Sequence, residues 1–436
     1  MNYLDNIFFA ILIACGIYFF SSNFKKIIRN IKLGQDVDRK DNPKQRWKNM
    51  AMIALGQSKM VKRPVAGILH VIVYISFIII NIEIVEIIID GLFGTHRVFA
   101  FIGSSYNFLI ATFEILAASV LVAVIIFYAR RNIIKLKRFV SSDLNGWPRS
   151  DANYIIYFEI ILMTLFLLMN ATDLKYQLLM PSAFPVSKYL TPLFINMSPQ
   201  LVHSLETTFW WLHITGILIF LNYLYFSKHL HILLAFPNTY FADLKPLGQF
   251  DNFASVTSEV KLMMDPNADP YATVAPDSNA VPSKFGASDV QDLNWMQLMN
   301  AYTCTECGRC TSVCPASITG KKLSPRKIMM DTRDRLVEVG KNIDANKGIF
   351  VPDNKTLLND YITAEELWAC TSCNACVEEC PINISPLSII MDMRRYLVME
   401  QSAAPMPVNA MMTNIENNGA PWQYSQQDRL NWKNEN

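Results

Sequence analysis

Five long apolar segments constrain the fold of this chain more than any other feature of its sequence. They cover approximately residues 6–23, 65–89, 106–129, 153–171 and 207–234. Each is long enough to cross a bilayer as a helix, which takes about 20 residues. Charged residues make up only 17% of the chain, whereas a typical soluble protein has about 25%. We therefore predict an all-α fold in which residues 1–235 form a bundle of five transmembrane helices.

The distribution of Lys and Arg between the loops predicts the orientation of this bundle. Segments 24–64 and 130–152 together hold eighteen Lys and Arg, whereas segments 90–105 and 172–206 hold three. Because basic loops stay on the cytoplasmic side, we predict that the N-terminus lies outside and that everything after residue 235 is cytoplasmic. The expected location is the inner membrane of a bacterial cell. The net charge of +2 is too balanced for a protein that binds nucleic acid.

Two cysteine motifs of identical spacing follow in the second half of the chain. Residues 304–315 read CTECGRCTSVCP and residues 370–381 read CTSCNACVEECP, and both have the spacing Cys-x2-Cys-x2-Cys-x3-Cys-Pro. This spacing is typical of a domain with two [4Fe–4S] clusters, in which the fourth cysteine of each motif binds the other cluster. We predict one cluster on Cys304, Cys307, Cys310 and Cys380 and the other on Cys370, Cys373, Cys376 and Cys314.

Two other uses of these cysteines are disfavoured. A structural zinc site would show isolated Cys-x2-Cys pairs, and disulfides do not persist in a reducing cytoplasm. Eight of the nine cysteines fall in the two motifs, which is not the distribution of a disulfide framework.

Helix signals surround the cysteine motifs. Ser324-Pro325 and Ser385-Pro386 each place an N-cap residue before a proline at the first helical position. Thr363 and Glu366 have the spacing of a capping box. Because no strand alternation is visible in this region, we predict a helical ferredoxin domain over residues 291–401.

The segments on either side of this domain have a different character. Residues 236–290 are rich in Pro, Ala, Asn, Asp and Ser and are predicted to form a polar linker. Residues 402–436 form a tail for which we expect a docking role.

Three histidines in the apolar segments indicate haem. His213 and His231 are eighteen residues apart, which is five turns of one continuous helix, so both would project from one face about 27 Å apart. His70 lies about two turns from the cytoplasmic end of the second segment, at the depth of His231. A lone histidine in an apolar helix is commonly a hydrogen-bonded core residue, but two imidazoles at one depth are what bis-histidine haem b requires. We predict haem b between His70 and His231 and leave a second haem at His213 open.

A family resemblance supports the histidine assignment. The stretch WWLHITGILIFLNYLYFSKHLH (210–231) resembles the last helix of the membrane cytochrome b subunit of respiratory nitrate reductase. It is also similar to the membrane subunit of heterodisulfide reductases. The resemblance implies that His213 and His231 are haem ligands.

The second helix departs from the pattern of that family. There the helix carries two ligands, of which His70 matches the first, but Ile80 stands ten residues later at the position of the second. A second haem would therefore need a substitute ligand. His96 is the better candidate for that role and His203 the weaker one.

Four carboxylates also fall within the predicted spans. A carboxylate costs free energy to place in lipid, so one that is found there is interpreted first as functional. Glu83, Glu86 and Glu114 belong to the outer half, where a quinol could bind and release protons. The alternative for Glu86 and Asp90 is that they reach the water outside. We expect Glu159 to pair with a basic residue at the inner face.

Residues 285–436 resemble the two-cluster subunit of heterodisulfide reductase. The resemblance is carried by NWMQLMNAYTCTECGRC, GKKLSPRKIMMD and MDMRRYLVME. In fused reductases of this family, a segment like residues 414–432 leads to a third domain with CCG-type cysteine motifs. No cysteine follows Cys380 here. The resemblance therefore implies a separate cytoplasmic CCG-domain protein that docks on the tail.

These parts predict a membrane-bound electron-transfer protein. Electrons would pass between the cytoplasmic partner and the quinone pool through two [4Fe–4S] clusters and haem b. The resemblance implies that electron-transfer flavoprotein or a thiol/disulfide couple feeds the partner. The alternative is a membrane-anchored iron–sulfur redox sensor or assembly factor without quinone activity. No nucleophile–base pair or Gly-rich phosphate loop is visible, so we predict no catalytic residue and exclude hydrolases and kinases.

Overall fold

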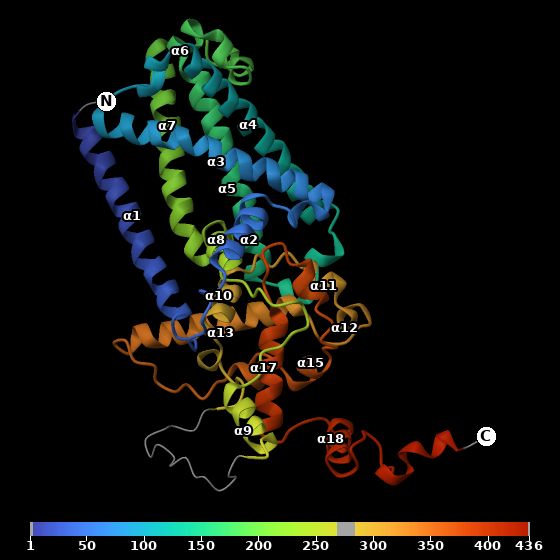
Figure 1. The fold of residues 1–436 in the computed structure, drawn as a ribbon. Helices are drawn as coiled ribbons and strands as arrows, with labels where there is room; N and C mark the ends of the chain where they lie inside the picture. Colours follow the sequence, from blue (N-terminus) through green and yellow to red (C-terminus); the bar gives the residue numbers. More distant parts are fainter. Residues whose placement is uncertain (1–2, 268–283, 435–436) are drawn as a thin grey trace.

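The computed structural model describes residues 3–267 and 284–434, and in these ranges it contains helices and no β-strand. Figure 1 shows a bundle of long helices at one end of the molecule and shorter helices at the other. Five of the described helices are long and apolar enough to cross a membrane. They are α1 (Tyr3–Ile31), α3 (Pro64–Phe93), α4 (Ser104–Tyr128), α5 (Trp147–Thr172) and α7 (Pro199–Tyr223). The predicted all-α class with five helices that could cross a membrane is confirmed.

Local sequence signals set where the long helices begin and end. Pro64 and Pro199 stand in the first turn of α3 and α7, where no backbone donor is needed. Ser198 caps α7 by accepting a hydrogen bond from the backbone N–H of Leu201 at 3.4 Å. α3 ends at Gly94, whose φ of 70° is a left-handed conformation that glycine adopts at little cost. Large apolar side chains remain exposed on the outside of the bundle, as expected for a surface that meets lipid.

The core of the bundle lies around α5, which packs against both α4 and α7. Phe113, Phe166 and Ile214 are buried in one apolar cluster contributed by these three helices. Aromatic side chains bury a large area each, so this cluster holds the three helices together.

The fifth span differs from its prediction as one helix over residues 207–234. The long helix α7 stops early, and a new helix starts with His231. Between them lie two 3₁₀ turns and an extended residue, in the order α7 (Pro199–Tyr223), Leu224–Phe226, Ser227, Lys228–Leu230 and α8 (His231–Tyr240). The five-turn register expected between His213 and His231 therefore does not exist.

Side-chain hydrogen bonds explain the interruption. Ser227 has extended backbone angles (φ −113°, ψ 147°), and its hydroxyl accepts from the backbone N–H of His229 at 3.1 Å. The carboxylate of Asp151, from the start of α5, accepts from the backbone N–H of Lys228 at 3.1 Å. These side chains satisfy donors that a continuous helix would otherwise satisfy, so the chain can leave the helix at this point.

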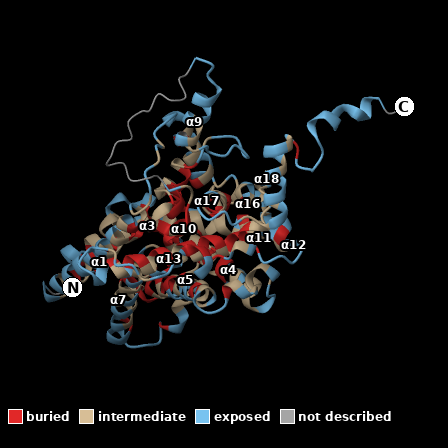
Figure 2. Ribbon diagram, turned by 90° about the horizontal axis from the view of Figure 1, so that it is seen from below, coloured by how far each residue is buried: buried red, intermediate tan, exposed pale blue. Residues whose placement is uncertain are grey.

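The shorter helices form the region that contains the cysteine motifs. The predicted helix starts are confirmed at Ser324, Thr363 and Ser385, and the capping box between Thr363 and Glu366 has both of its hydrogen bonds. Figure 2 shows that the buried residues of this region gather around α10, α13 and α17. The helices are α10 (Trp295–Thr303), α11 (Arg309–Val313), α12 (Pro315–Ile318), α13 (Pro325–Ala345), α14 (Leu357–Asp360), α15 (Ala364–Trp368), α16 (Ala375–Glu379) and α17 (Pro386–Met399).

The predicted linker over residues 236–290 is more structured than expected where it is described. Its first residues belong to α8, in which Asn238 and Thr239 are fully buried. A further helix, α9 (Ala254–Met264), follows, and residues 268–283 lie outside the described ranges. Val290, at the end of the segment, is buried in the core of the cysteine-containing region.

The tail projects from the rest of the molecule. It contains α18 (Met406–Asn418) and a 3₁₀ segment over Gln426–Lys433, and neither has a buried residue. Figures 1 and 2 both show this segment leading away from the helices that carry the cysteines.

The cysteine-containing region packs directly against the membrane helices. The side-chain amide of Asn30, near the end of α1, donates to the hydroxyl of Tyr302 on α10 at 2.8 Å. The neighbouring Arg29 donates to the backbone carbonyl of Gly340 on α13 at 3.0 Å. α10 also packs against α8. These contacts join the two parts of the chain at the end of the bundle where the basic loops lie.

Candidate functional site

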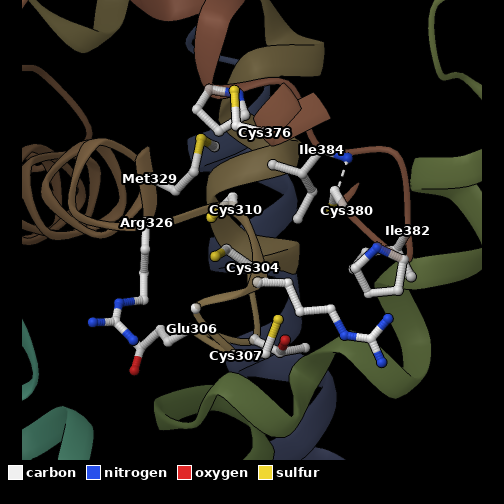
Figure 3. Close-up of a pocket in the computed structure, with 15 residues that line it drawn as sticks. Cys304, Glu306, Cys307, Cys310, Arg326, Met329, Cys376, Cys380, Ile382 and Ile384 are labelled. Carbon is white, nitrogen blue, oxygen red and sulfur yellow. Dashed lines mark hydrogen bonds between the residues drawn. The ribbon is translucent and has the colours of Figure 1, made fainter. Parts of the chain in front are cut away.

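The first three cysteines of the first motif and the last cysteine of the second lie around one cavity. Cys304 follows α10, Cys307 and Cys310 come next along the chain, and Cys380 follows α16. Figure 3 shows Cys304, Cys307 and Cys310 close together, with Cys380 across the cavity. The structure thus brings together the four residues expected to bind one cluster, and Cys376 also lines this cavity.

The other four cysteines are close to one another as well. Burial, and after it the charges of Cys370, Cys314 and Cys373, raise the pKa of the Cys376 thiol to about 12. Cys314 from the first motif therefore lies with three cysteines of the second motif. Cys373 is exposed, whereas Cys314 is buried, so this group reaches the surface of the protein on one side.

The chemistry of both groups fits iron–sulfur clusters. Burial raises the pKa of Cys304 to about 12 and that of Cys380 to about 11, so the free thiols are neutral and would lose their protons on binding iron. The backbone N–H of Ile384 donates to Sγ of Cys380 at 3.3 Å, and that of Ser372 donates to Sγ of Cys370 at 3.4 Å. Hydrogen bonds of this kind tune the potential of a cluster.

The first motif faces the membrane helices. Arg309, between Cys307 and Cys310, donates to the backbone carbonyl of Lys59 at 3.2 Å and to that of Met60 at 3.0 Å. Both acceptors lie just before α3. The first motif therefore lies against the loop that leads into α3.

A buried ion pair links the same motif to the fifth span. Glu306 lies between Cys304 and Cys307, and its side chain, which is 2% exposed, pairs with Lys228. It also pairs with Arg333 on α13 at 2.6 Å. Although burial acts in the opposite direction, the charges of Arg333 and Lys228 hold the pKa of Glu306 below its ordinary value.

The link continues from Lys228 to a candidate haem ligand. The backbone carbonyl of Lys228 accepts a hydrogen bond from Nδ1 of His231 at 3.2 Å. Sequence reasoning did not single out Lys228 or Glu306. The sequence signal that could have identified them is a charged residue beside candidate ligands. This residue is Lys228 in the stretch SKHLH and Glu306 in the stretch CTEC.

His70 and His231 face each other at this end of the bundle. Their ring centroids are 6.4 Å apart, and the rings are inclined by 40°. Two imidazoles bound on opposite sides of one metal ion, with metal–nitrogen bonds of about 2 Å, have ring centroids about 6 Å apart. The bond from Nδ1 of His231 to Lys228 leaves Nε2 free to bind a metal, and Nδ1 of His70 is buried without a hydrogen-bond partner in the described part of the chain. The pair therefore fits bis-histidine ligation of haem.

A third imidazole lies beside this pair. The ring of His229 is 5.3 Å from that of His231 and perpendicular to it. On its other side His229 packs against Phe220, also at 5.3 Å between ring centroids.

His213 lies apart from the other histidines. It is buried, its ring contacts Phe166 at 6.0 Å, and its Nδ1 has no hydrogen-bond partner within the described ranges. Both candidate substitute ligands are engaged elsewhere, because His96 and His203 each lie beside Glu206. The structure does not bring either of them to His213.

The carboxylates in the outer half of the bundle have mainly structural contacts. Glu86 accepts from the backbone N–H of Phe99 at 2.8 Å and from the hydroxyl of Tyr106 at 2.9 Å. Asp90 is buried and accepts from the backbone N–H of Arg97 at 2.7 Å. Neither carboxylate simply reaches bulk water, which was the alternative for them.

Glu114 also has structural contacts, whereas Glu159 differs from expectation. Glu114 is fully buried and accepts from the backbone N–H groups of Val186 and Ser187 at 2.8 and 3.0 Å, so it holds the loop between α6 and α7. Glu159 has no ion-pair or hydrogen-bond partner among the described residues, so the basic partner expected for it is not found.

Comparison with known proteins places these cysteines in a known domain type. Residues 303–384 match the model of the family described as 4Fe-4S dicluster domain. Over 98% of its length the chain is 28% identical to the probable iron-sulfur-binding oxidoreductase FadF of Bacillus subtilis and covers 60% of that protein. It is 25% identical to the EtfAB:quinone oxidoreductase of Syntrophomonas wolfei, again over 98% of its length, and covers 59% of that protein. Its homologues are iron–sulfur oxidoreductases.

Heterodisulfide reductase subunits are also among the homologues. Over 34% of its length the chain is 27% identical to a subunit of the dihydromethanophenazine:CoB–CoM heterodisulfide reductase of Methanosarcina mazei, and it covers 36% of that subunit. The resemblance seen in the sequence is thereby confirmed. The chain spans about three fifths of the length of the two oxidoreductases. No solved structure matches it.

Proposed function

We propose that this protein carries electrons between a cytoplasmic redox partner and the quinone pool, through two [4Fe–4S] clusters and haem b. The observation that supports this most is the order of the candidate centres. Cys373 of one cysteine group is exposed, the other group contacts the bundle through Arg309, and His231 and His70 follow across the Lys228–Glu306 pair. Such an order forms a path from the protein surface into the membrane.

The proposed ligand sets follow the two cysteine groups. One cluster is held by Cys304, Cys307, Cys310 and Cys380 and the other by Cys370, Cys373, Cys376 and Cys314. The second cluster exchanges electrons with the partner because it reaches the surface. His70 and His231 hold haem b, which supplies one-electron chemistry, and the chain's own residues supply ligands, orientation and hydrogen bonds. For His213 we propose no haem, because no second histidine lies opposite it in the described part of the bundle.

The homologues support the proposed partner and the proposed use of quinone. One homologue is named an EtfAB:quinone oxidoreductase, so electron-transfer flavoprotein and quinone are the redox couples we propose. Heterodisulfide reductase subunits work with further subunits, which supports a separate cytoplasmic CCG-domain protein as the docking partner of the tail. We place the protein in the bacterial inner membrane with the clusters in the cytoplasm, because the basic loops lie at that end of the bundle.

Cofactor content and quinone reactivity test the proposal together. The full chain, purified in detergent, is expected to contain eight cluster irons and one haem b, counted as its pyridine haemochrome. After reduction with dithionite and removal of excess reductant, a menaquinone analogue should reoxidise both the haem and the clusters. The redox-sensor alternative predicts clusters without haem and no oxidation by the quinone.

A histidine variant and its matched control make the test specific. His231→Ala should lose the haem band and the oxidation of its clusters by quinone but keep its cluster iron. His203→Ala removes a histidine that is 80% exposed at the other end of the bundle and should retain the haem band and the cluster iron. An unchanged haem spectrum in His231→Ala would show that the ligand assignment is wrong.

A further inference from the structure

A second polar site lies at the end of the bundle farthest from the cysteines. Here the last turns of α3, the start of α6 (Leu174–Leu179) and the first turns of α7 surround a cavity of about 450 Å³. The lining residue on α3 that is nearest to His70 in the sequence is Glu83, thirteen residues beyond it, which corresponds to about 20 Å along the helix. This site is therefore separate from the candidate haem site.

Three potential metal ligands converge at the mouth of this cavity. His96 comes from the loop after α3, Asp173 caps α6, and Glu206 lies on α7. One donor atom of each lies within 4.8 Å of the others. Nε2 of His96 is 3.3 Å from Oδ2 of Asp173 and 3.8 Å from Oε1 of Glu206. Neighbouring ligands of a tetrahedral zinc ion, at metal–ligand distances of about 2.1 Å, are about 3.4 Å apart.

A fourth ligand is available nearby. Nδ1 of His203 lies 3.4 Å from Oε2 of Glu206, and the His203 side chain is exposed. With His203 the set contains two imidazoles and two carboxylates, a combination of nitrogen and oxygen donors that suits Zn²⁺.

The charges of the cavity favour a cation. Five carboxylates line it, against two permanently charged basic side chains, Arg97 and Lys175, and the two histidines. One of the five, Glu83, is only 4% exposed, and its Oε2 has no hydrogen-bond partner in the part of the chain that the structure describes. A buried carboxylate oxygen without a partner is costly, so a cation or a proton supplied from the cavity would stabilise it.

Arg97 has a supporting role in this arrangement. Its Nε donates to Oδ2 of Asp173 at 2.7 Å, and its Nη2 donates to Asn170 at 2.9 Å. Hydrogen bonds to a ligating carboxylate commonly fix its orientation. The charge of Arg97 opposes a neighbouring cation, but the carboxylates of the cavity outnumber it.

We propose that His96, Asp173 and Glu206 form a binding site for a divalent cation of the zinc class, with His203 as the fourth ligand. The ion would join the loop after α3 to α6 and α7. The competing explanation for the same contacts is an ion pair in which a protonated His96 lies between two carboxylates and no metal binds.

Equilibrium dialysis against Zn²⁺ alone tests the site in the detergent-purified full chain with its clusters loaded. Zinc and iron are measured on the same sample, so that zinc in emptied cysteine sites is recognised by a loss of iron. The wild type is expected to bind one more zinc ion than His96→Gln or Glu206→Gln, or to bind it with at least about tenfold higher affinity. Bound zinc should also raise the thermal unfolding temperature of the wild type but not of these variants.

Glu83→Gln is the matched control. Like Glu206→Gln, it replaces one carboxyl group of the same cavity by an amide, but it leaves the proposed ligands in place. If Glu83→Gln loses zinc as fully as Glu206→Gln does, the cavity attracts cations without a defined site and the proposal is wrong. The proposal also fails if the wild type takes up no zinc beyond that of His96→Gln.

Discussion

At the scale of single residues, Lys228 lies beside both candidate redox centres. Its backbone carbonyl orients His231, and its ammonium group pairs with Glu306 inside the first cysteine motif. Both side chains are nearly buried. Breaking a buried pair by removing one partner commonly costs about 3–5 kcal/mol, because the other charge is left uncompensated. We therefore expect this pair to affect both stability and potential.

Glu306→Gln tests the contribution of the buried pair. The variant should unfold at a lower temperature, with a loss of about 3 kcal/mol in the free energy of unfolding. Removal of a negative charge next to a cluster should also raise the reduction potential of that cluster, because the reduced form carries more negative charge. An EPR-monitored redox titration measures the potential. Glu365→Gln is the control, because it breaks only the exposed pair with Lys322 and should change neither quantity.

Replacing the fourth cysteine of each motif by serine tests which cysteines bind which cluster. Cys380→Ser should damage the cluster of the first motif and leave an uncoupled signal from the second, as seen by EPR of the dithionite-reduced protein. Cys314→Ser should give the opposite result. If each substitution damages the cluster of its own motif instead, the crossed assignment is incorrect.

At the scale of elements, the crossing of α1 and α13 holds the cysteine-containing region against the bundle. Gly340 allows this close approach, since a Cβ atom there would lie 2.4 Å from the side-chain amide of Asn30. That amide is buried and bonded to Tyr302. The close packing of the two helices therefore depends on one contact, between the small residue Gly340 and the polar residue Asn30.

Gly340→Ala should weaken this contact. An alanine within a helix normally gains about 1 kcal/mol over glycine, but here the clash with Asn30 should outweigh that gain and lower the thermal unfolding temperature. Lys341→Ala, at an exposed position of α13, should have little effect. In the double variant with Asn30→Ala the clash is removed, so the cost of Gly340→Ala should become smaller. Equal costs in both backgrounds would contradict this explanation.

For the whole molecule, the basic loops and the cysteine-containing region lie at one end of the bundle and the cavity with His96 lies at the other. Because basic loops are retained in the cytoplasm, their position predicts which side of the membrane each candidate site faces. The proposed clusters would face the cytoplasm, and the proposed cation site would face the outside.

Cysteine labelling in spheroplasts tests this orientation. Lys188→Cys, in the loop before α7, should react with a membrane-impermeant maleimide in intact spheroplasts. Asn409→Cys, in the exposed helix α18, should react only after lysis. The reverse pattern would show that the bundle is inserted in the opposite direction.

Much of this protein was determined by its sequence alone, because the relevant signals are local. Apolar length predicted the five spans, cysteine spacing predicted the two groups, and Ser324, Thr363 and Ser385 predicted helix starts. Tertiary structure decided what depends on partners distant in the chain. Asp151 and Ser227 end the helix that was expected to continue to His231, and Glu306 recruits Lys228. His96 and Glu206 meet only because α3 ends and α7 begins at the same side of the bundle, which no sequence period can show.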